Sequence, residues 1–362
     1  MLRKHPQIRR RPVARALALG AISAIGLAAC GGTSSSSGTS SSSTSSSGTS
    51  VKRVTIAFIS QGTSNSWAAQ LDAVARKTAN QLGVKLTYFN GEGNATTQLP
   101  LIQQAIAQHP DAIVLVPLGE AADTGPVERA MAAGIKVILL DSTVNTNDYT
   151  SLVNPDAATA SVPLAEWLAK KLNYKGNLLY VGGLPGNATT ILYDKGFYSV
   201  MNKYSNIHIV NAGNANYSIS TAKQLAATAI ASGRKFTGAW GVGGEAVTGI
   251  MLAYADSNIR PIPPVAGAAA TNGTLRLAVQ DNIQAAMLQF PPTDSQLAIQ
   301  IAYKAIKGQP VPKIINVSTL SQYGDIFPPL SSYYKPQYSD DMYVGTNNVL
   351  NDSELRSLNL LK

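Results

Sequence analysis

The sequence predicts an α/β fold of two lobes, each built on a parallel β-sheet that helices cover on both faces. Three observations predict this fold. Apolar runs with the length of buried strands alternate with segments whose apolar residues recur at helical spacing. Eight or more such units follow residue 51, which exceeds what one open sheet usually holds. The 362 residues also suffice for two domains of ordinary size.

The first strand and helix of this region have the clearest signals. Val54–Ile59 is an apolar run with the length of a buried strand. A loop rich in Gly, Ser and Asn follows it. From Trp67 to Leu82 the apolar residues recur at helical spacing, and Gly83 closes the segment. We therefore expect an amphipathic helix that packs on the first sheet.

Two further helices of the first half contain a proline. Pro100 fits a helix over Leu99–Ala107 if it lies in the first turn, where backbone N–H groups lack partners within the helix. Another helix is expected to open at Pro126 and to end at Gly134. The other strands expected in this half are 85–89, 112–116 and 135–140.

The alternation then repeats in the second half. The helices expected here are 157–172, 189–204, 219–232 and 245–256. The strands expected here are 178–182, 207–211, 236–241 and 264–268. Such alternation favours two Rossmann-like lobes with parallel sheets. Because ligands gather at the carboxyl ends of parallel strands, two lobes with these ends facing each other would form a binding cleft.

The first 50 residues have the features of an export signal and a tether. Residues 1–29 contain six basic residues and no acidic residue, and they end in the apolar run Ala16–Ala29. This run is shorter than the ~20 residues that a helix needs to cross a bilayer, which argues against a transmembrane anchor. Gly31–Ser50 consists of Ser, Thr and Gly, so we expect a flexible linker with a root-mean-square span of about 25 Å.

The apolar run leads into Leu27-Ala-Ala-Cys30-Gly, which resembles the bacterial lipobox. The resemblance implies that the thiol of Cys30 is lipidated and that Cys30 becomes the new N-terminus. The alternative is a chance cysteine beside an ordinary cleavage site. Because Cys30 is the only cysteine, internal disulfides and thiolate metal clusters are excluded. We expect a lipid-anchored protein of the periplasm or the cell surface.

The formal charge of +9 does not indicate a nucleic-acid partner. Without the six basic residues of the expected signal, 23 basic and 20 acidic residues remain, a net charge of +3. A surface that binds a phosphate backbone needs a larger and clustered excess of positive charge. We therefore expect no binding to nucleic acid.

Several stretches in order carry a resemblance to a known family. They are Val54–Ser60 with Ser64–Trp67, Ala112–Pro117, Ala133–Asp141, Gly183–Gly186 with Gly196 and Phe197, and Met287–Pro291. From about Val51 to about Pro312 the chain resembles the type I periplasmic binding proteins, in particular the ribose- and galactose-like sugar-binding branch. The resemblance implies a small, sugar-like ligand, captured by hinge closure and delivered to the membrane permease of an ABC importer. It implies no cofactor, and we expect a monomer.

The resemblance also implies a three-strand hinge. The chain is expected to cross between lobes near Asp141–Thr143, Gln289–Pro291 and Val317–Thr319. The expected parts are a signal peptide at 1–29, a lipidated cysteine and linker at 30–50, an N-terminal lobe of 51–142 plus 291–318, and a C-terminal lobe of 143–290 plus 319–362. The tail from residue 320 is longer than the resemblance leads us to expect.

Four candidate ligand contacts lie in the first lobe. Sugars need hydrogen-bonding groups around the ring and aromatic faces against it. Asn65 offers a donor and an acceptor, and Trp67 either stacks on a ring or belongs to the core of the first helix. Glu120 follows the third strand, where the alternative is a helix-capping or solvated carboxylate. Asp141 ends the fourth strand, where the alternative is an acceptor for backbone amides.

Two further candidates are matched through the resemblance. Tyr217 matches an aromatic residue that closes the pocket from the second lobe; the alternative is a partly exposed loop tyrosine. Gln289 matches a hinge glutamine that binds the sugar; the alternative is a hinge residue bonded to the backbone.

Three polar anchors of the sugar-binding branch are replaced. Ile191, Gly243 and Ala269 stand where the branch commonly has an arginine, an asparagine and an aspartate. Each lost charge-assisted hydrogen bond removes about 1.5–3 kcal/mol of binding free energy. We therefore expect a ligand that is larger or less hydroxylated than ribose, or contacts supplied by Thr271, Asn272 and water.

Two other classes of function have weaker support in the sequence. Gly241–Ala246 fits a loose dinucleotide-binding pattern, but the next strand ends in alanines at 268–270 rather than in an acid, so a tight turn is favoured over a Rossmann-type enzyme. None of the three histidines has an evident nucleophile or metal-ligand partner, and no short catalytic motif is present. We expect no enzymatic activity and no metal site. A sensor lipoprotein that signals to a membrane receptor is the alternative to delivery to an importer.

Overall fold

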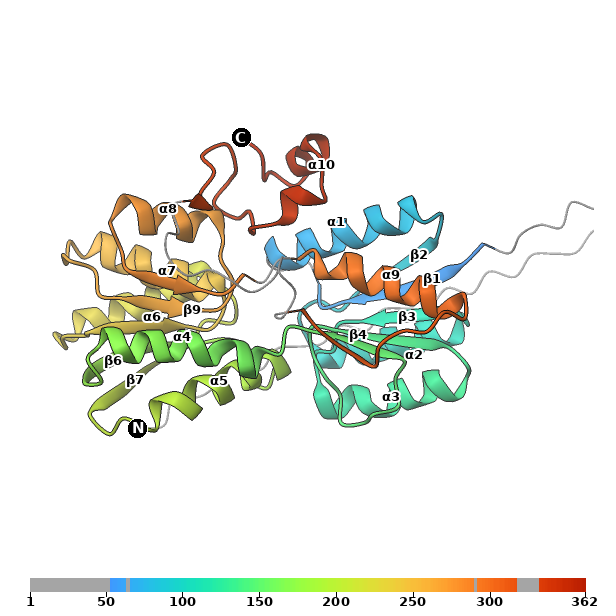
Figure 1. Ribbon diagram of the computed structural model, residues 1–362, viewed down its shortest axis with the longest axis horizontal. Coiled ribbons are helices and arrows are strands. Elements are labelled where there is room, and N and C mark those ends of the chain that lie inside the picture. The colour runs from blue at the N-terminus through green and yellow to red at the C-terminus, as the bar shows by residue number, and fades with distance from the viewer. Residues whose placement is uncertain (1–52, 63–65, 290–291, 318–331) are drawn as a thin grey trace, which may run out of the picture. The chain divides into compact units, whose positions relative to one another are not determined.

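The computed structural model describes residues 53–62, 66–289, 292–317 and 332–362. They fold into two α/β lobes, each with its own parallel sheet (Figure 1). The expected signal peptide, Cys30 and the expected linker lie outside the described residues. Within the described ranges no helix combines the length and the apolar composition that crossing a bilayer requires.

The first lobe is built on a six-stranded sheet whose neighbouring strands are all parallel. In spatial order its strands are β11 (Ile314–Asn316), β5 (Ser151–Asn154), β4 (Lys136–Leu140), β3 (Ala112–Leu115), β1 (Thr55–Ser60) and β2 (Lys85–Asn90). Along β1, Ile56 and Phe58 enter the core on one face, and Ala57 and Ile59 enter the core on the other. Burial on both faces explains why these strands are continuous apolar runs.

Four helices cover this first sheet. They are α1 (Ser66–Gln81) and α9 (Asp294–Ile306) on one face, and α2 (Ala95–Ala107) and α3 (Glu120–Ala132) on the other (Figure 1). Helix α1 buries Trp67 and Leu71 in the core, as its apolar spacing predicts.

The second lobe is built on a five-stranded parallel sheet. In spatial order its strands are β10 (Ala285–Met287), β9 (Val265–Gly267), β8 (Gly238–Gly241), β6 (Gly176–Gly182) and β7 (Ile207–Asn214). The helices are α4 (Ala157–Lys171) and α5 (Ala188–Met201) on one face, and α6 (Ile219–Ala231), α7 (Gly244–Asp256) and α8 (Asn272–Gln280) on the other. The rings of Tyr180 and Phe197 pack with centroids 5.4 Å apart and hold α5 on β6.

Every strand and helix expected from the sequence has a counterpart, but two helices begin earlier than predicted. Helix α2 begins four residues early because the side chain of Asn94 accepts a hydrogen bond from the N–H of Thr96 at 2.7 Å. Pro100 therefore lies inside the helix rather than in its first turn. Helix α3 begins six residues before Pro126, and the carboxylate of Asp123 in its first turn accepts hydrogen bonds from two backbone N–H groups.

The predicted boundary of the first lobe, between residues 142 and 143, is wrong because β5 belongs to the first sheet. Strand β5 pairs with β4 in parallel, with Leu152 opposite Leu139. No helix lies between these two strands, so the strand–helix alternation that marked the other strands is missing here. The chain enters the second lobe after β5, where α4 begins. The predicted crossings at 289–291 and 317–319 lie mostly outside the described ranges, which end at Gln289 and at Val317.

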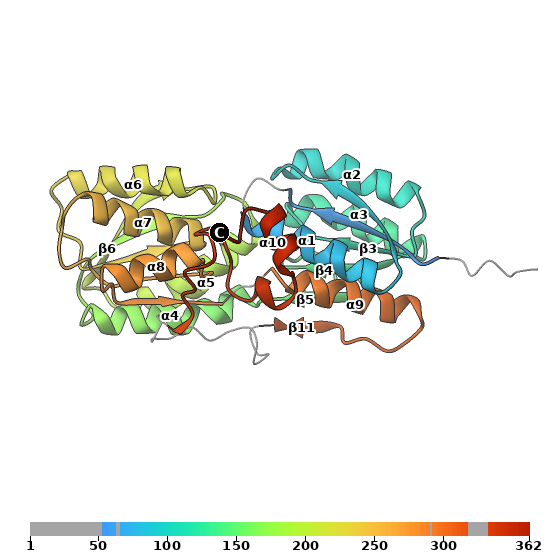
Figure 2. The ribbon, with the colours of Figure 1, turned by 90° about the horizontal axis from the view of Figure 1, so that it is seen from above.

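The C-terminal segment, residues 332–362, contacts both lobes, although we predicted that it belongs to the second lobe alone. It contains the short helices η3 (Thr346–Asn348) and α10 (Asp352–Ser357). Tyr343 forms a β-bridge with Thr271, just before α8 of the second lobe. Leu350 packs against Val74 on α1 of the first lobe. Figures 1 and 2 agree that α10 lies beside α1.

Candidate ligand-binding site

A cavity lies at the carboxyl ends of strands from both sheets. The empty space among its lining residues is about 480 Å³, including open solvent at its mouth. The first lobe contributes Gln61, Trp67 and Asp141, and the C-terminal segment contributes Tyr343. The second lobe contributes Asn187, Thr189, Tyr193, Tyr217, Gly243, Gly244, Glu245, Ala268 and Ala269. This position is where parallel α/β sheets generally bind ligands.

The backbone is strained around this cavity. Four lining residues have φ in the left-handed region: Asp141 (+70°), Tyr217 (+55°), Gly243 (+94°) and Ala269 (+61°). For a residue with a side chain this conformation costs about 1–3 kcal/mol. Each of the four lies one to three residues after a strand, so the strain turns the chain sharply at the cavity edge. Strain gathered in this way is typical of a functional site.

Asp141 and Thr189 join the two lobes at the cavity. The hydroxyl of Thr189, in the first turn of α5, lies 3.4 Å from Oδ2 of Asp141, which follows β4. The same hydroxyl lies 2.8 Å from Oγ of Ser142. Burial raises the pKa of Asp141 to about 7, and the hydrogen bond from Thr189 opposes this rise. The carboxyl group can therefore both accept and, when protonated, donate a hydrogen bond near neutral pH.

Two buried polar atoms of the cavity wall have unused hydrogen-bonding capacity. Oδ1 of Asp141 and the hydroxyl of Tyr193 have no hydrogen-bond partner among the described residues. Oδ1 of Asp294, at the start of α9, is in the same condition, and the charge of Asp141 adds to burial in raising its pKa. Buried polar atoms are normally paired, so unpaired polar atoms of residues that line a cavity leave hydrogen-bonding capacity for a polar ligand or water.

Tyr217 closes the cavity from the second lobe through a network of hydrogen bonds. Its hydroxyl lies 2.7 Å from Oγ1 of Thr190 and donates to Oδ1 of Asn187 at 3.3 Å. Gly243 lies beneath its ring, since a Cβ there would come within 2.9 Å of the Tyr217 side chain. Burial raises the pKa of Tyr217, so its hydroxyl stays protonated at neutral pH.

Glu245 and Tyr343 form the third polar group of the cavity. The hydroxyl of Tyr343 donates to Oε1 of Glu245 at 2.8 Å, and both side chains are buried. Burial raises the pKa of Glu245, while the α7 backbone and Tyr343 oppose this rise through their hydrogen bonds. Among the described residues that line the cavity, none is Lys or Arg.

Three of the predicted contact residues line this cavity: Trp67, Asp141 and Tyr217. Trp67 also belongs to the core of the first lobe, so its core interpretation is confirmed, and its stacking on a ligand stays a prediction. Asn65 lies outside the described residues.

The other two predicted contact residues lie elsewhere. Glu120 is the first residue of α3, where its carboxylate accepts a hydrogen bond from the hydroxyl of Thr143 at 3.3 Å. Gln289 lines a different cavity, which is bounded mainly by the C-terminal segment.

The three replaced anchors behave differently. Gly243 and Ala269 line the cavity and leave it without a polar side chain at these positions. Ile191 is 50% exposed, whereas Tyr193, two residues further along α5, is buried and lines the cavity. Residues two apart on a helix point in nearly opposite directions, so Ile191 points away from the cavity that Tyr193 lines.

The residues expected to replace the lost contacts have other partners. The side chain of Asn272 donates to the carbonyls of Lys335 and Tyr338, at 3.0 Å each, and accepts from the N–H of Lys335. The hydroxyl of Thr271 accepts from the N–H of Thr274 and caps α8. Both side chains thus stabilise the protein's own structure and do not line the cavity, whereas Tyr343 lines it.

Six polar lining residues were not predicted as contacts, and the sequence carries a signal for some of them. They are Gln61, Asn187, Thr189, Tyr193, Glu245 and Tyr343. Asn187 stands before a helix, where an Asn commonly caps, and its place after a second-lobe strand could have identified it. Glu245 lies in the glycine turn that we weighed as a cofactor site. No local pattern marks Tyr343.

Comparisons with known proteins agree with this architecture. A family model described as periplasmic binding protein domain matches residues 56–310. A galactofuranose-binding protein of Escherichia coli (strain K12) is 24% identical over 215 residues, which cover 58% of this chain and 68% of the relative. A D-apiose import binding protein of Paraburkholderia graminis is 25% identical over 281 residues, which cover 76% of this chain and 89% of the relative.

Solved structures share the fold. The crystal structure of a galactofuranose-binding protein is 22% identical and has a TM-score of 0.66 over 72% of this chain and 91% of its own. The binding protein of an arabinose ABC transporter from Shewanella sp. ANA-3, bound to L-arabinofuranose, is 18% identical and has a TM-score of 0.67 over 72% of this chain and 89% of its own. The chain belongs to the periplasmic binding protein domain family, as a type I member of its ribose- and galactose-like branch.

Proposed function

We propose that this protein is an exported solute-binding lipoprotein that captures a neutral monosaccharide or polyol between its lobes and delivers it to the permease of an ABC importer. The observation that carries the proposal is the make-up of the cavity wall. Unpaired polar atoms of Asp141 and Tyr193 lie in the same wall as the aromatic rings of Trp67 and Tyr217. The hydroxyl groups of a sugar would form hydrogen bonds with these polar atoms, and the apolar face of its ring would pack on the aromatic rings.

The relatives support a sugar as the ligand class. Their names specify galactofuranose, D-apiose and xylitol, which are all neutral and hydroxylated. The cavity supports the same class, because carboxyl groups of Asp141 and Glu245 line it and no Lys or Arg does so among the described residues. An anionic sugar would be repelled there, with no positive charge to compensate.

Export and lipid attachment are proposed from the N-terminal sequence. The apolar run, the residues before Cys30 and the Ser/Thr/Gly linker support a lipid anchor and a location in the periplasm or at the cell surface. The names of the relatives support a binding role without catalysis. Replacement of Cys30 by Ser tests the anchor: incorporation of an alkyne-tagged fatty acid should be lost, and the protein should leave the membrane fraction.

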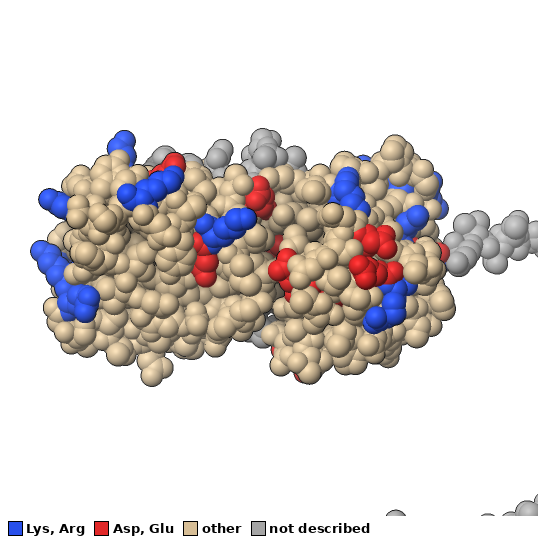
Figure 3. All heavy atoms as spheres, turned by 90° about the horizontal axis from the view of Figure 1, so that it is seen from below, with Lys and Arg blue, Asp and Glu red and all other residues tan. Residues whose placement is uncertain are grey.

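The face of the molecule seen in Figure 3 gives no support to a nucleic-acid partner. On the face shown in Figure 3, Lys and Arg lie in small groups, and Asp and Glu lie among them. A protein that binds a nucleic-acid backbone would present a continuous basic stripe.

A thermal-shift screen of the purified full chain in mild detergent tests the ligand. Neutral aldoses, furanoses, polyols, uronic acids and sugar phosphates would be compared over a range of concentrations. A ligand at 100 times its Kd stabilises the folded state by about 2.7 kcal/mol, so a neutral sugar should raise the melting temperature in a saturable way. A response to acidic sugars alone would contradict the proposed class.

Delivery is tested in cells. Deletion of the gene should abolish uptake of the radiolabelled ligand found in the screen. If uptake is unchanged but the transcriptional response to that ligand is lost, the result would contradict delivery to an importer and support a sensing function.

A further inference from the structure

We propose that Tyr343, from the C-terminal segment, contacts the bound ligand and helps to determine which sugar the cavity accepts. This inference rests on the proposed function and deepens it. The family domain covers residues 56–310, so the C-terminal segment lies outside the match. Tyr343 nevertheless lines the cavity and is only 2% exposed. Ligand specificity would then depend on a part of the chain that the family domain does not contain.

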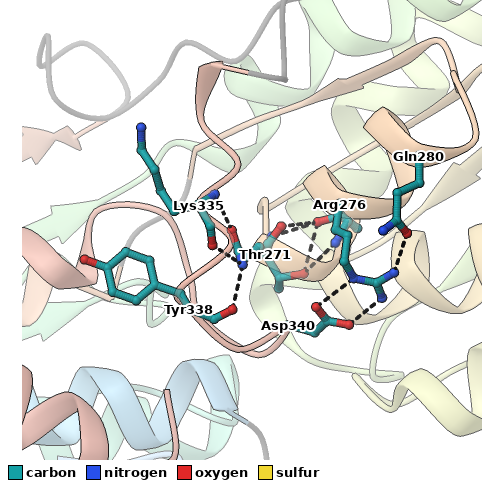
Figure 4. A network of polar contacts seen from close by, with 8 residues as sticks. Thr271, Arg276, Gln280, Lys335, Tyr338 and Asp340 are labelled. Carbon is teal, nitrogen blue, oxygen red and sulfur yellow. Dashed lines mark hydrogen bonds and ion pairs between the residues drawn. The ribbon is translucent and has the colours of Figure 1, made fainter. Parts of the chain in front are cut away.

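The second lobe holds the C-terminal segment next to the cavity. Figure 4 shows Arg276 of α8 beside Asp340 of the C-terminal segment. The guanidinium of Arg276 binds both carboxylate oxygens of Asp340, with a distance of 3.0 Å from Nε to Oδ1. The amide of Asn272 binds the backbone of Lys335 and Tyr338, at 3.0 Å in each case. Residues 335–340 are therefore fixed to α8 just before the chain reaches Tyr343.

The first lobe holds the backbone at Tyr343 itself. Oε1 of Gln70, on α1, accepts the N–H of Tyr343 at 3.1 Å, and Nε2 of Gln70 donates to the carbonyl of Asp341 at 2.8 Å. Thr271 forms a β-bridge with Tyr343 from the other side. Because both lobes contact this short stretch, the direction in which the Tyr343 side chain enters the cavity is determined.

The second lobe is also shaped to accept the phenol. A Cβ at Gly244 would come within 2.7 Å of the carbonyl oxygen of Ala269 and 3.4 Å of the Tyr343 hydroxyl. A larger residue at 244 would therefore press on the strand-end turn against which Tyr343 lies. The hydroxyl then reaches Oε1 of Glu245 at 2.8 Å.

The pair offers hydrogen-bond acceptors to a ligand. The Tyr343 hydroxyl donates its proton to Glu245, which leaves its own lone pairs and Oε2 of Glu245 to accept. Gly243 and Ala269, which line the same part of the cavity, carry no polar side chain. A hydroxyl of a neutral sugar at this end therefore has the Tyr343–Glu245 pair as its protein partner from the described residues.

Deoxy sugars test this contact directly. Isothermal titration calorimetry would measure the full chain against the tightest neutral sugar of the screen and each of its monodeoxy analogues. The wild type should lose about tenfold in affinity for the analogue that lacks the contacting hydroxyl. Tyr343→Phe should bind the parent sugar about tenfold more weakly and should no longer discriminate against that analogue. Tyr338→Phe, in the same segment but outside this cavity, should match the wild type.

The outcomes separate this inference from the proposed function. If Tyr343→Phe weakens every analogue equally, or weakens none, Tyr343 is not a ligand contact although the protein binds sugar. If the wild type binds no neutral sugar, the proposed function fails and this inference fails with it. Should Tyr343→Phe not fold, as judged by its melting curve, Glu245→Gln keeps the size of the partner and should lose discrimination against the same analogue.

Discussion

Asp141 and Thr189 meet across the two lobes at the wall of the cavity, with 3.4 Å between the carboxylate oxygen and the hydroxyl. The carboxyl group follows a strand of the first sheet, and the hydroxyl stands in the first turn of a second-lobe helix. A ligand that binds beside this contact touches both lobes at once. The contact therefore ties ligand binding to the relative position of the lobes, and two predictions depend on it.

The first prediction concerns pH. Burial raises the pKa of Asp141 from its ordinary 3.8 to about 7, so between these values the folded state binds more protons than the unfolded state. The stability that Asp141 contributes is therefore present below about pH 4 and is lost as the pH rises through 7. Melting temperatures of the wild type and of Asp141→Asn would be measured from pH 4 to 8. The melting temperature of the variant should rise relative to that of the wild type as the pH rises. A difference in melting temperature that stays constant with pH would contradict the raised pKa.

The second prediction concerns the hydroxyl of Thr189. Thr189→Val keeps the shape but removes the hydrogen bond that opposes the rise in the pKa of Asp141, so this pKa should rise further. A lost hydrogen bond of this kind costs about 1 kcal/mol, so ligand affinity should fall about fivefold by calorimetry. Thr228→Val is the matched control, because Thr228 is exposed on α6 and bonds only within its helix. Equal losses of ligand affinity in the two variants would show that the interlobe contact does not contribute to binding.

The third prediction concerns Gly243. In Gly243→Ala, the new Cβ would approach the ring of Tyr217 to 2.9 Å and displace it, so ligand affinity should fall at least tenfold. Gly134→Ala is the control: its φ of +78° is similar to the +94° of Gly243, but a Cβ there meets nothing within 4 Å. In chemical denaturation Gly134→Ala should lose about 1–2 kcal/mol of stability because it forces a side chain to positive φ. Gly243→Ala should lose more, because its φ of 94° and ψ of 153° suit glycine alone and its Cβ also meets Tyr217. Only Gly243→Ala should change binding.

Patterns with a fixed period could be predicted from the sequence. Successive residues of 56–59 enter the cores on opposite faces of the first sheet. Because both faces are buried, all of these residues are apolar, and the apolar run predicts the strand. The position of Asp141 at the cavity could also be predicted, because ligands gather at the carboxyl ends of parallel strands.

Features set by distant contacts could not be predicted. Strand β5 pairs with β4 without an intervening helix, so it carries no alternation. Ile191 and Tyr193 differ by two positions on one helix, and a register error of that size exchanges the solvent face for the cavity face. Tyr343 reaches the cavity through contacts with residues 70, 245 and 271, which are remote in sequence.

The last prediction concerns the attachment of the C-terminal segment to α8. Arg276 binds the carboxylate of Asp340 in a two-pronged contact that lowers the pKa of Asp340, so Arg276→Ala should loosen the segment at a cost of about 1 kcal/mol. Limited proteolysis should then cut within residues 332–362 faster than in the wild type. Lys223→Ala removes a more exposed ion pair, with Asp256, and should leave this rate unchanged. Equal protection of the segment in both variants would mean that its other contacts suffice to hold it.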